Sequence, residues 1–352
     1  MKLLKKYYKN KRILITGHTG FKGSWLSSLL NLIGSNVYGV SLSIEKNSHY
    51  ENLKLHKKIK SKLLDIRNFK KLNHHLKLIK PDIVFHLAAQ SLVKSSYLKP
   101  IETWSTNVMG TLNVIESIKS LNRKCTLIII TSDKCYLNKE KKSGYKESDE
   151  LGGYDPYSAS KASTEHVFFS EYHSFLKFNK KIRIASARGG NVVGGGDWSK
   201  NRIIPDFIKS IIKKNFLKVR NPHSTRPWVH VLEPLMGYLK LAYKLDKNIN
   251  LNGKAFNFGS NSKSRKSVKD ILLEINKKMI TGKWKFSKID KNIIETKNLN
   301  IDSKNAKKNL HWNANLTFEK RMKLTAEWYY AFIKNKKIIT LNQIKDFLKN
   351  YQ

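Results

Sequence analysis

Short apolar runs alternate with amphipathic segments along the first half of the chain. Continuously apolar runs such as residues 125–132 are typical of strands buried on both faces of a parallel sheet. Segments such as 68–80 repeat apolar residues at the spacing of a helix face. We predict strands over 12–16, 36–42, 62–65, 125–132 and 182–187, a strand with its following loop over 82–90, and helices over 24–33, 68–80, 103–119 and after Pro156. This alternation predicts an α/β fold with a doubly wound parallel sheet.

A glycine-rich turn follows the first predicted strand. Gly17, Gly20 and Gly23 stand between that strand and the apolar-periodic segment 24–33. Glycines let the backbone turn tightly and approach a pyrophosphate, and free amides at a helix start attract its negative charge. A strand, a glycine turn and a helix in this order predict dinucleotide binding rather than a plain surface turn.

The composition indicates a globular protein without a membrane partner. The chain has 352 residues, 40% of them hydrophobic, and no apolar run long enough to form a membrane-spanning helix. Its basic start leads into a strand and not into a signal peptide's apolar region. Cys125 and Cys135 favour free thiols and a cytoplasmic location. The scattered histidines predict no metal site.

The formal net charge of +42 first suggests a nucleic-acid-binding protein. The lysines are dispersed over the whole length, whereas a nucleic-acid footprint should cluster on one face. We therefore expect no nucleic-acid partner. A positive field could still attract a diphosphate substrate.

Chemically active residues follow the predicted strand 125–132. Tyr157 and Lys161 are four residues apart and share one face of a helix that Asp155 caps and Pro156 begins. A lysine ammonium near a phenol lowers the pKa of the phenol, so we expect Tyr157 to act as a base near neutral pH. Ser132, in the motif TSD, ends the preceding strand.

These motifs resemble the extended, nucleotide-sugar-modifying branch of the short-chain dehydrogenase/reductase superfamily. The TGxxGxxG spacing at 16–23 and the serine, tyrosine and lysine just described carry the resemblance. Within the branch, Asp133-Lys134 in TSDKCY resembles the CDP-glucose 4,6-dehydratases, because enzymes for dTDP-glucose have Asp-Glu there. The blocks GHTGFKGSWL, HLAAQSLV, NVMGT, GYDPYSASKA, ARGGNVVGGGDW and NPHSTRPWVHVLEPL agree with that family.

The resemblance implies a hydro-lyase that converts CDP-D-glucose to CDP-4-dehydro-6-deoxy-D-glucose with tightly held NAD. Tyr157 would take the proton of the 4-hydroxyl group. Asp133 and Lys134 would share the removal of the C5 proton and the protonation of the departing 6-hydroxyl, and which residue performs which step stays open. The implied catalytic residues are Ser132, Asp133, Lys134, Tyr157 and Lys161.

The resemblance also implies which residues contact the ligands. Cofactor contacts are expected from Gly17, Thr19, Gly20, Phe21, Gly23, Asp65, Ile66, Leu87, Ala88, Ala89, Asn107, Tyr157 and Lys161. Substrate contacts are expected from Gln90, Ser132, Asn191, Arg202, Arg226 and His230, where His230 is equally consistent with a structural role. Near the end of strand 36–42 the chain offers Ser41 and Ser43, with Glu45 only slightly later, where an acidic residue would bind the adenosine ribose. The motif alone thus leaves NAD and NADP open, and the lack of an arginine there favours NAD.

By the same resemblance, a Rossmann-type NAD-binding domain covers 11–188, with 227–260 returning to it. A smaller C-terminal substrate-binding lobe is formed by 189–226 and 261–335, and 1–10 and 336–352 are basic terminal extensions. A homodimer or homotetramer is expected to pack through 103–119 and 156–169, and the product is expected to supply a deoxysugar for a surface polysaccharide such as O-antigen.

Rival interpretations remain at this point. The nearest rivals are a 4-epimerase and a 4,6-dehydratase for a dTDP-, GDP- or UDP-sugar. Another is a catalytically silent relative that only binds the dinucleotide, which the presence of Ser132, Tyr157 and Lys161 argues against.

Overall fold

A seven-stranded parallel sheet forms the centre of the computed structural model, which describes residues 1–141, 143–260, 266–278, 282–287 and 298–351. Its strand order is β11-β6-β5-β4-β1-β2-β3, so the order reverses between β4 and β1. A sheet of this kind opens a crevice at the reversal, outside the carboxyl ends of the strands. The predicted doubly wound α/β fold is confirmed. The strands are β1 (Arg12–Thr16), β2 (Asn36–Ser41), β3 (Lys60–Leu63), β4 (Ile83–His86), β5 (Cys125–Ser132), β6 (Ile182–Gly189) and β11 (Ala255–Phe258).

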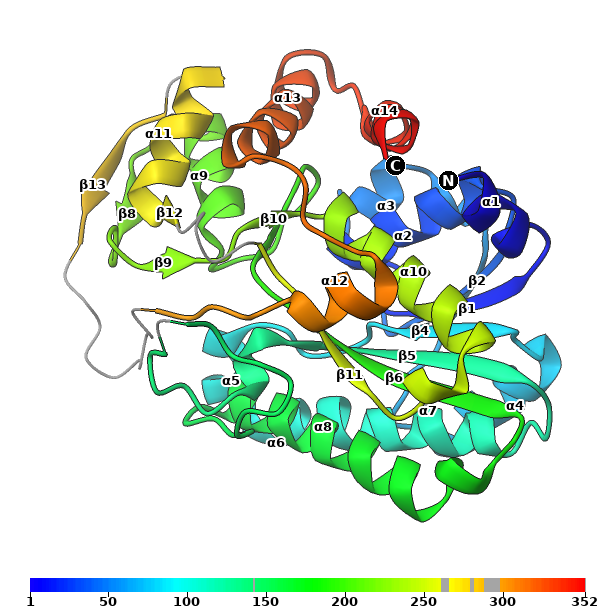
Figure 1. Cartoon of the computed structure of the whole chain (residues 1–352). Coiled ribbons are helices and arrows are strands. Elements are labelled where there is room, and N and C mark those ends of the chain that lie inside the picture. The colour runs from blue at the N-terminus through cyan, green and yellow to red at the C-terminus, as the bar shows by residue number, and fades with distance from the viewer. Residues whose placement is uncertain (142, 261–265, 279–281, 288–297, 352) are drawn as a thin grey trace.

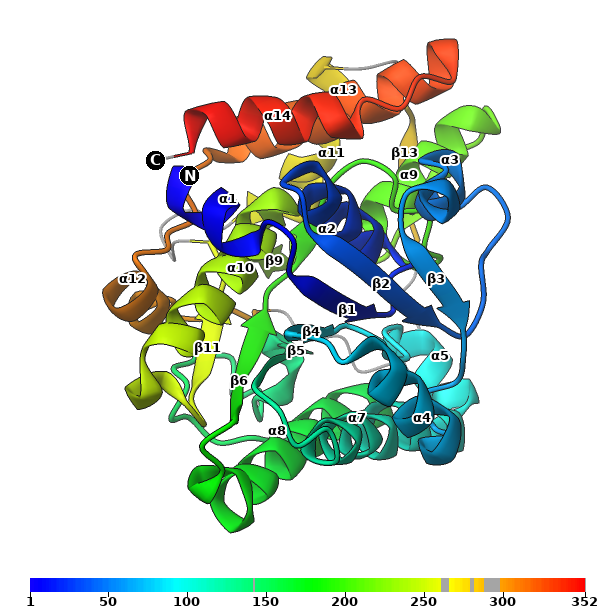
Figure 2. The same ribbon diagram turned by 90° about the vertical axis from the view of Figure 1, so that its right-hand side faces the viewer.

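Helices cover both faces of the sheet, as Figures 1 and 2 show. One face carries α4 (Phe69–Ile79), α7 (Gly110–Lys119) and α8 (Pro156–Ser174), and the other carries α2 (Phe21–Leu32), α10 (Leu232–Lys247) and α12 (Lys304–Leu310). Successive residues of a strand therefore meet different layers. In β1, Ile13 and Ile15 pack into the core under α2 and α10, whereas Leu14 packs under α4 and α7. This is why the strands are apolar at nearly every position.

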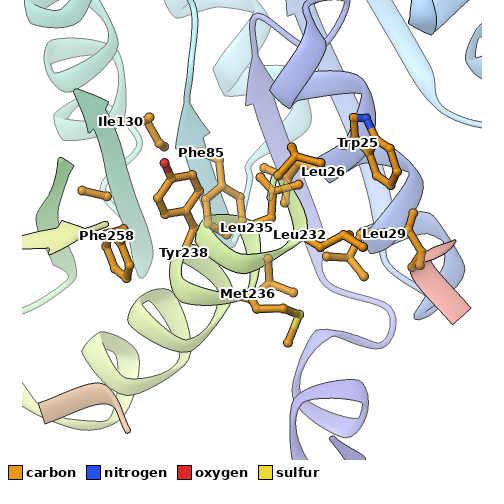
Figure 3. Close-up of a cluster of buried hydrophobic side chains, with 14 of the residues drawn as sticks. Trp25, Leu26, Leu29, Phe85, Ile130, Leu232, Leu235, Met236, Tyr238 and Phe258 are labelled. Carbon is orange, nitrogen blue, oxygen red and sulfur yellow. The ribbon is translucent and has the colours of Figure 1, made fainter. Parts of the chain in front are cut away.

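Helix α10 packs beside α2 on the same face of the sheet, and their buried side chains form one cluster (Figure 3). Leu232 and Leu235 lie between the side chains of the sheet and those of α2, and Tyr238 meets Phe258 of β11 edge to face at 5.3 Å. Trp25 of α2 closes the other end of this cluster and is completely buried. A fully buried apolar cluster thus anchors α2 and α10 to the sheet.

A smaller group of elements lies on the side of the sheet that carries α2 and α10 (Figure 1). Here β8 (Leu217–Val219) pairs with β13 (Trp284–Phe286), and the pair is accompanied by α9 (Ile203–Ile212), α11 (Val268–Lys278) and α13 (Phe318–Asn335). Part of the predicted lobe segment 261–335 lies outside the described residues. The remaining short elements are α3 (His49–Asn52), α5 (Val93–Leu98), α6 (Pro100–Trp104), β7 (Val192–Val193) paired with β10 (Val229–His230), β9 (Thr225–Arg226) paired with β12 (Lys266–Ser267), and the 3-10 turns Leu55–Lys57, Asp133–Cys135, Leu176–Phe178 and Ile249–Leu251.

Both basic terminal segments form helices that pack on the core. In α1 (Lys2–Tyr8), the buried Tyr8 hydroxyl donates a 2.7 Å hydrogen bond to the Leu239 carbonyl of α10. Helix α14 (Thr340–Asn350) packs on α2, and the Thr340 hydroxyl bonds to the His49 imidazole at 2.8 Å. The two chain ends lie close together (Figures 1 and 2). These segments are therefore part of the folded unit.

Several element boundaries differ from the prediction; for example, β4 ends at His86 and β6 continues to Gly189. Strand β3 begins two residues earlier than expected, because this exposed edge strand lacks a buried face that would fix its ends. The first helix begins at Phe21, within the glycine turn. The predicted helix 103–119 consists of α6, a π-helical turn over Ser105–Met109 and α7. At its end Gly110 lies so close to Ile66 that a side chain there would overlap it; such wider turns interrupt regular helices at special packing sites.

Candidate active site

The glycine turn is fixed by close backbone contacts. Gly17 has a φ of +75°, which favours glycine, and a side-chain carbon there would lie 2.8 Å from the Ala88 amide nitrogen. A carbon on Gly23 would lie 2.1 Å from the Gly17 carbonyl oxygen. The turn leads into the N-terminus of α2, with Gly20 as the exposed N-cap. The structure thus forms a tight cradle with free amides, which fits a pyrophosphate group.

The end of β2 lies beside this turn. The Thr19 amide donates to the Ser41 hydroxyl at 3.3 Å, and the Thr19 hydroxyl donates to the Ser43 carbonyl at 2.9 Å. Further along the crevice, Asp65 forms a 2.6 Å ion pair with Arg67, whose hydrogen bonds hold the pKa of Asp65 below its ordinary value. Ile66 is buried against Gly110. Phe21 is half-buried at the first position of α2.

Asn107 ties the loop after β4 to its surroundings. Its side chain accepts from the Gln90 amide at 2.8 Å and donates to the Gln90 carbonyl and the Ser160 hydroxyl. Gln90 also donates to the Thr103 hydroxyl at 2.9 Å. Both predicted ligand-binding side chains therefore have partners within the protein. Leu87, Ala88 and Ala89 belong to the same loop and are half-buried.

Three consecutive polar residues stand where β5 ends. The Ser132 hydroxyl donates to Asp133 at 3.0 Å and accepts from the Lys134 amide at 3.2 Å. Asp133 is 3% exposed, and its second oxygen, Oδ2, has no partner among the described residues. Burial raises the pKa of Asp133, opposed by Lys134, Ser132 and Arg226. The protonated carboxyl group is thereby favoured more than in an exposed aspartate.

Tyr157 and Lys161 lie next to this segment on α8, which begins as predicted: Asp155 accepts from the Ser158 amide, and Pro156 is the first helical residue. Tyr157 hydrogen-bonds to Ser132. The expected lowering of its pKa is wrong for the chain without ligands, because burial raises the pKa of Tyr157 to about 12 while Ser132 and Arg202 oppose the rise.

The lysine of the pair is also perturbed. Burial lowers the pKa of Lys161 to about 8, opposed by Glu165 and Cys135. Both Lys161 and Tyr157 are less than a tenth exposed. Desolvation is therefore the largest influence on the pKa of both side chains, and it depends on how the chain packs around them.

The predicted substrate-binding residues divide into two groups. Arg202 forms a 3.2 Å ion pair with Asp197 and acts on the pKa of Tyr157, and Arg226 acts on the pKa of Asp133, so both positive charges lie within electrostatic reach of the site. Asn191 is half-buried beside this region. His230 is completely buried; its backbone amide donates to Glu233 at 2.8 Å. This burial indicates a structural role for His230, and its contact with substrate stays a prediction.

Sequence reasoning missed one cation of the site. Lys22 is half-buried in the first turn of α2. Burial lowers its pKa to about 7, with Arg202 and Lys161 acting in the same direction and Asp133 opposing. The residue could have been noticed as a lysine inside the glycine turn, but lysines are too common in this chain to stand out.

Comparison with known proteins identifies the family. The family described as GDP-mannose 4,6 dehydratase matches residues 14–325. The CDP-glucose 4,6-dehydratase of Salmonella typhimurium is 38% identical, over 98% of this chain and 98% of that protein. The chain belongs to the GDP-mannose 4,6-dehydratase family. The name of the Salmonella protein agrees with the resemblance that the Asp133-Lys134 motif carries.

Solved structures agree with this family's fold. The epimerase Mth375 of Methanothermobacter thermautotrophicus has a TM-score of 0.81 at 22% identity, covering 97% of this chain and 96% of that one. DesIV, a dTDP-glucose 4,6-dehydratase of Streptomyces venezuelae with NAD and TYD bound, has a TM-score of 0.76 at 19% identity, covering 90% and 96%. These likenesses show the shared fold.

The state of the two cysteines can be compared with the structure directly. Cys125 and Cys135 are both buried free thiols, as predicted. Among the described residues, no helix is long and apolar enough to cross a membrane, and no cluster of His, Cys, Asp and Glu side chains could hold a metal ion.

Proposed function

We propose that this dehydratase-family chain removes water from CDP-D-glucose to give CDP-4-dehydro-6-deoxy-D-glucose, with NAD as its cofactor. The observation that carries the proposal is the pair Asp133-Lys134 beside Ser132 and Tyr157, in a chain 38% identical to a CDP-glucose 4,6-dehydratase over nearly its whole length. An acid and a base next to a hydroxyl-activating tyrosine are the groups that elimination requires.

The cradle around Gly17 and Gly23 fits the dinucleotide. Side-chain carbons at these two positions would occupy the space of the turn itself, so the backbone can approach a pyrophosphate closely. The amides of the α2 N-terminus would hold the phosphates, and Ser41 and Thr19 stand where the adenosine ribose would lie. When bound, NAD supplies reversible hydride transfer with the sugar.

Tyr157 would accept the proton of the sugar 4-hydroxyl. Its burial keeps the phenol neutral in the free chain, and nearby positive charge lowers a phenol's pKa. Arg202 is a cation that acts on Tyr157 in this way, and Lys161, one helical turn along α8, would be the second. Ser132 orients the phenol by its hydrogen bond.

Asp133 would act as the acid and Lys134 as the base in the elimination. Burial raises the pKa of Asp133, and its Oδ2 atom has no partner within the described chain, so a proton there can be donated to the departing 6-hydroxyl. Lys134 is less buried and next in sequence, and in its neutral amine form it would take the C5 proton. Arg226 and Arg202 would bind the diphosphate through their planar guanidinium groups.

We also propose a homodimer. The surface of α5, α6 and α8 exposes several large apolar side chains, which a second copy of the chain would bury. The exposed residues are Leu98, Ile101, Trp104 and Phe169, with Met109 on the adjoining π turn. The product would serve as the precursor of a deoxysugar in a surface polysaccharide.

Mass spectrometry of the product tests the reaction. The purified chain is incubated with NAD and CDP-glucose, dTDP-glucose or GDP-mannose in separate samples. Loss of one water from CDP-glucose supports the proposal. Conversion without a change in mass indicates an epimerase, and loss of water only from another sugar nucleotide refutes the choice of base.

A further inference from the structure

We infer that the buried ion pair between Glu165 and Arg188 is a positioning device that holds the segment 132–135 and Lys161 in their working arrangement. The inference rests on the proposed dehydratase function. Neither residue touches the reacting atoms in that proposal. Both act through side chains that do.

Glu165 connects α8 to two strands at the edge of the site. It is 1% exposed and forms a 2.8 Å ion pair with Arg188. Its other oxygen accepts hydrogen bonds from the hydroxyls of Thr131 in β5 and Ser186 in β6. Thr131 immediately precedes Ser132, so Glu165 fixes the chain just before the catalytic segment.

Arg188 fixes the chain just after that segment. Its guanidinium donates at 2.8 Å to the Tyr136 hydroxyl and lies over the Tyr136 ring, 5.0 Å from the centroid. It also donates to the Glu147 carbonyl at 3.1 Å. The Tyr136 hydroxyl donates in turn to Asn257 of β11 at 2.8 Å. The ion pair thus holds both ends of the four residues Ser132 to Cys135.

The same pair reaches the catalytic lysine. Glu165 follows Lys161 by one helical turn, and its negative charge opposes the effect of burial on the pKa of Lys161. The other groups that act around Lys161 are Cys135 from the 3-10 turn, Lys22 from α2 and His86 from β4. Arg188 partly neutralises Glu165. The paired charges of Glu165 and Arg188 therefore set the electric field at Lys161 as well as the position of the segment 132–135.

The decisive experiment separates the charge from the contacts. The variants are E165Q, R188M and the double variant E165Q/R188M. The pKa of Lys161 is followed by NMR of chains labelled with 13C at lysine Cε, without ligands, and is assigned by its absence in K161Q. In parallel, reduced nicotinamide formation and water loss are measured with NAD and CDP-glucose.

We expect opposite shifts in the single variants. E165Q leaves the Arg188 cation unpaired and should lower the pKa of Lys161, whereas R188M leaves the Glu165 anion unpaired and should raise it, each by about half a unit or more. The double variant should restore the pKa of Lys161 while water loss stays at least about tenfold slow, because the contacts of Arg188 to Tyr136 and to the Glu147 carbonyl are gone. Since it leaves no unpaired buried charge, it also carries the test if a single variant fails to fold.

A second buried pair provides the matched control. Glu233 and Arg321 pair at 2.7 Å between α10 and α13, with similar burial. E233Q should lower stability without moving the pKa of Lys161. The inference is overturned if E165Q, R188M and their double variant all leave the pKa of Lys161 unchanged, as E233Q should, and slow water loss no more than E233Q does. Failure of the wild type to dehydrate CDP-glucose would instead refute the proposed function, and the NMR arm would still decide the inference.

Discussion

Replacing Lys161 by Met should make the ligand-free chain more stable at neutral pH while abolishing turnover. Burial lowers the pKa of this lysine from 10.5 to about 8. Such a difference corresponds to about 3 kcal/mol of unfavourable free energy for holding the charged amine in the folded chain. Methionine has a similar length and carries no charge, so K161M should gain up to this amount.

The gain should depend on pH in a defined direction. Below the folded pKa of about 8, Lys161 is charged in both states and the full cost is present. Between about 8 and 10.5 the unfolded chain binds a proton that the folded chain does not, so wild-type stability rises with pH relative to K161M. Above 10.5 the amine is neutral in both states, and the advantage of K161M should disappear.

Guanidinium denaturation at pH 7 and at about pH 10 measures both effects. K71M, which removes an exposed lysine of α4, serves as the control and should differ little from the wild type at either pH. The reasoning is refuted if K161M is no more stable than the wild type at pH 7, or if its advantage does not shrink at high pH.

Three further predictions concern the acid, the cofactor cradle and the dimer. D133N keeps the shape of the side chain but not its acidity, so water loss should fall by about 10² to 10⁴ while reduced nicotinamide still forms on adding CDP-glucose; full turnover would contradict the assignment. G23A places a carbon 2.1 Å from the Gly17 oxygen and forces the turn open by about 1 Å, so NAD affinity by calorimetry should fall about 100-fold, and an unchanged Kd would contradict the cradle. I101D on the exposed face of α6 should convert a dimer to a monomer in light scattering; a chain that is monomeric as wild type refutes the proposed interface.

Much of the fold could be predicted because its determinants are local. Apolar runs such as Cys125–Ser132, the glycine spacing and the Asp155 cap each specify an element within a few residues. Parallel strands then bring their carboxyl ends to one edge, so Ser132 and the helix of Tyr157 meet without further information. The proximity of these side chains could therefore be predicted, while their catalytic roles stay predictions.

The remaining features depend on packing between distant segments. The raised pKa of Tyr157 results from desolvation, which the Tyr-x-x-x-Lys spacing does not report. The π turn at Ser105–Met109 accompanies the contact of Gly110 with Ile66, far away in the chain. The partnership of Glu165 with Arg188 likewise exists only once α8 lies against β6. Such pairs carry no periodic pattern that could be recognised beforehand.

The position of the last helix has a consequence for how the protein is made. Thr340, at the start of α14, hydrogen-bonds to His49 and to the Trp328 indole, and His49 bonds in turn to Ser24 in the first turns of α2. Chains emerge from the ribosome with the N-terminus first. The helix that carries the cofactor cradle therefore stays incompletely covered until α14 has been synthesised. A chain that stopped before Thr340 would contain every proposed catalytic residue and still lack the contacts that cover α2, so folding of the nucleotide-binding region depends on α14.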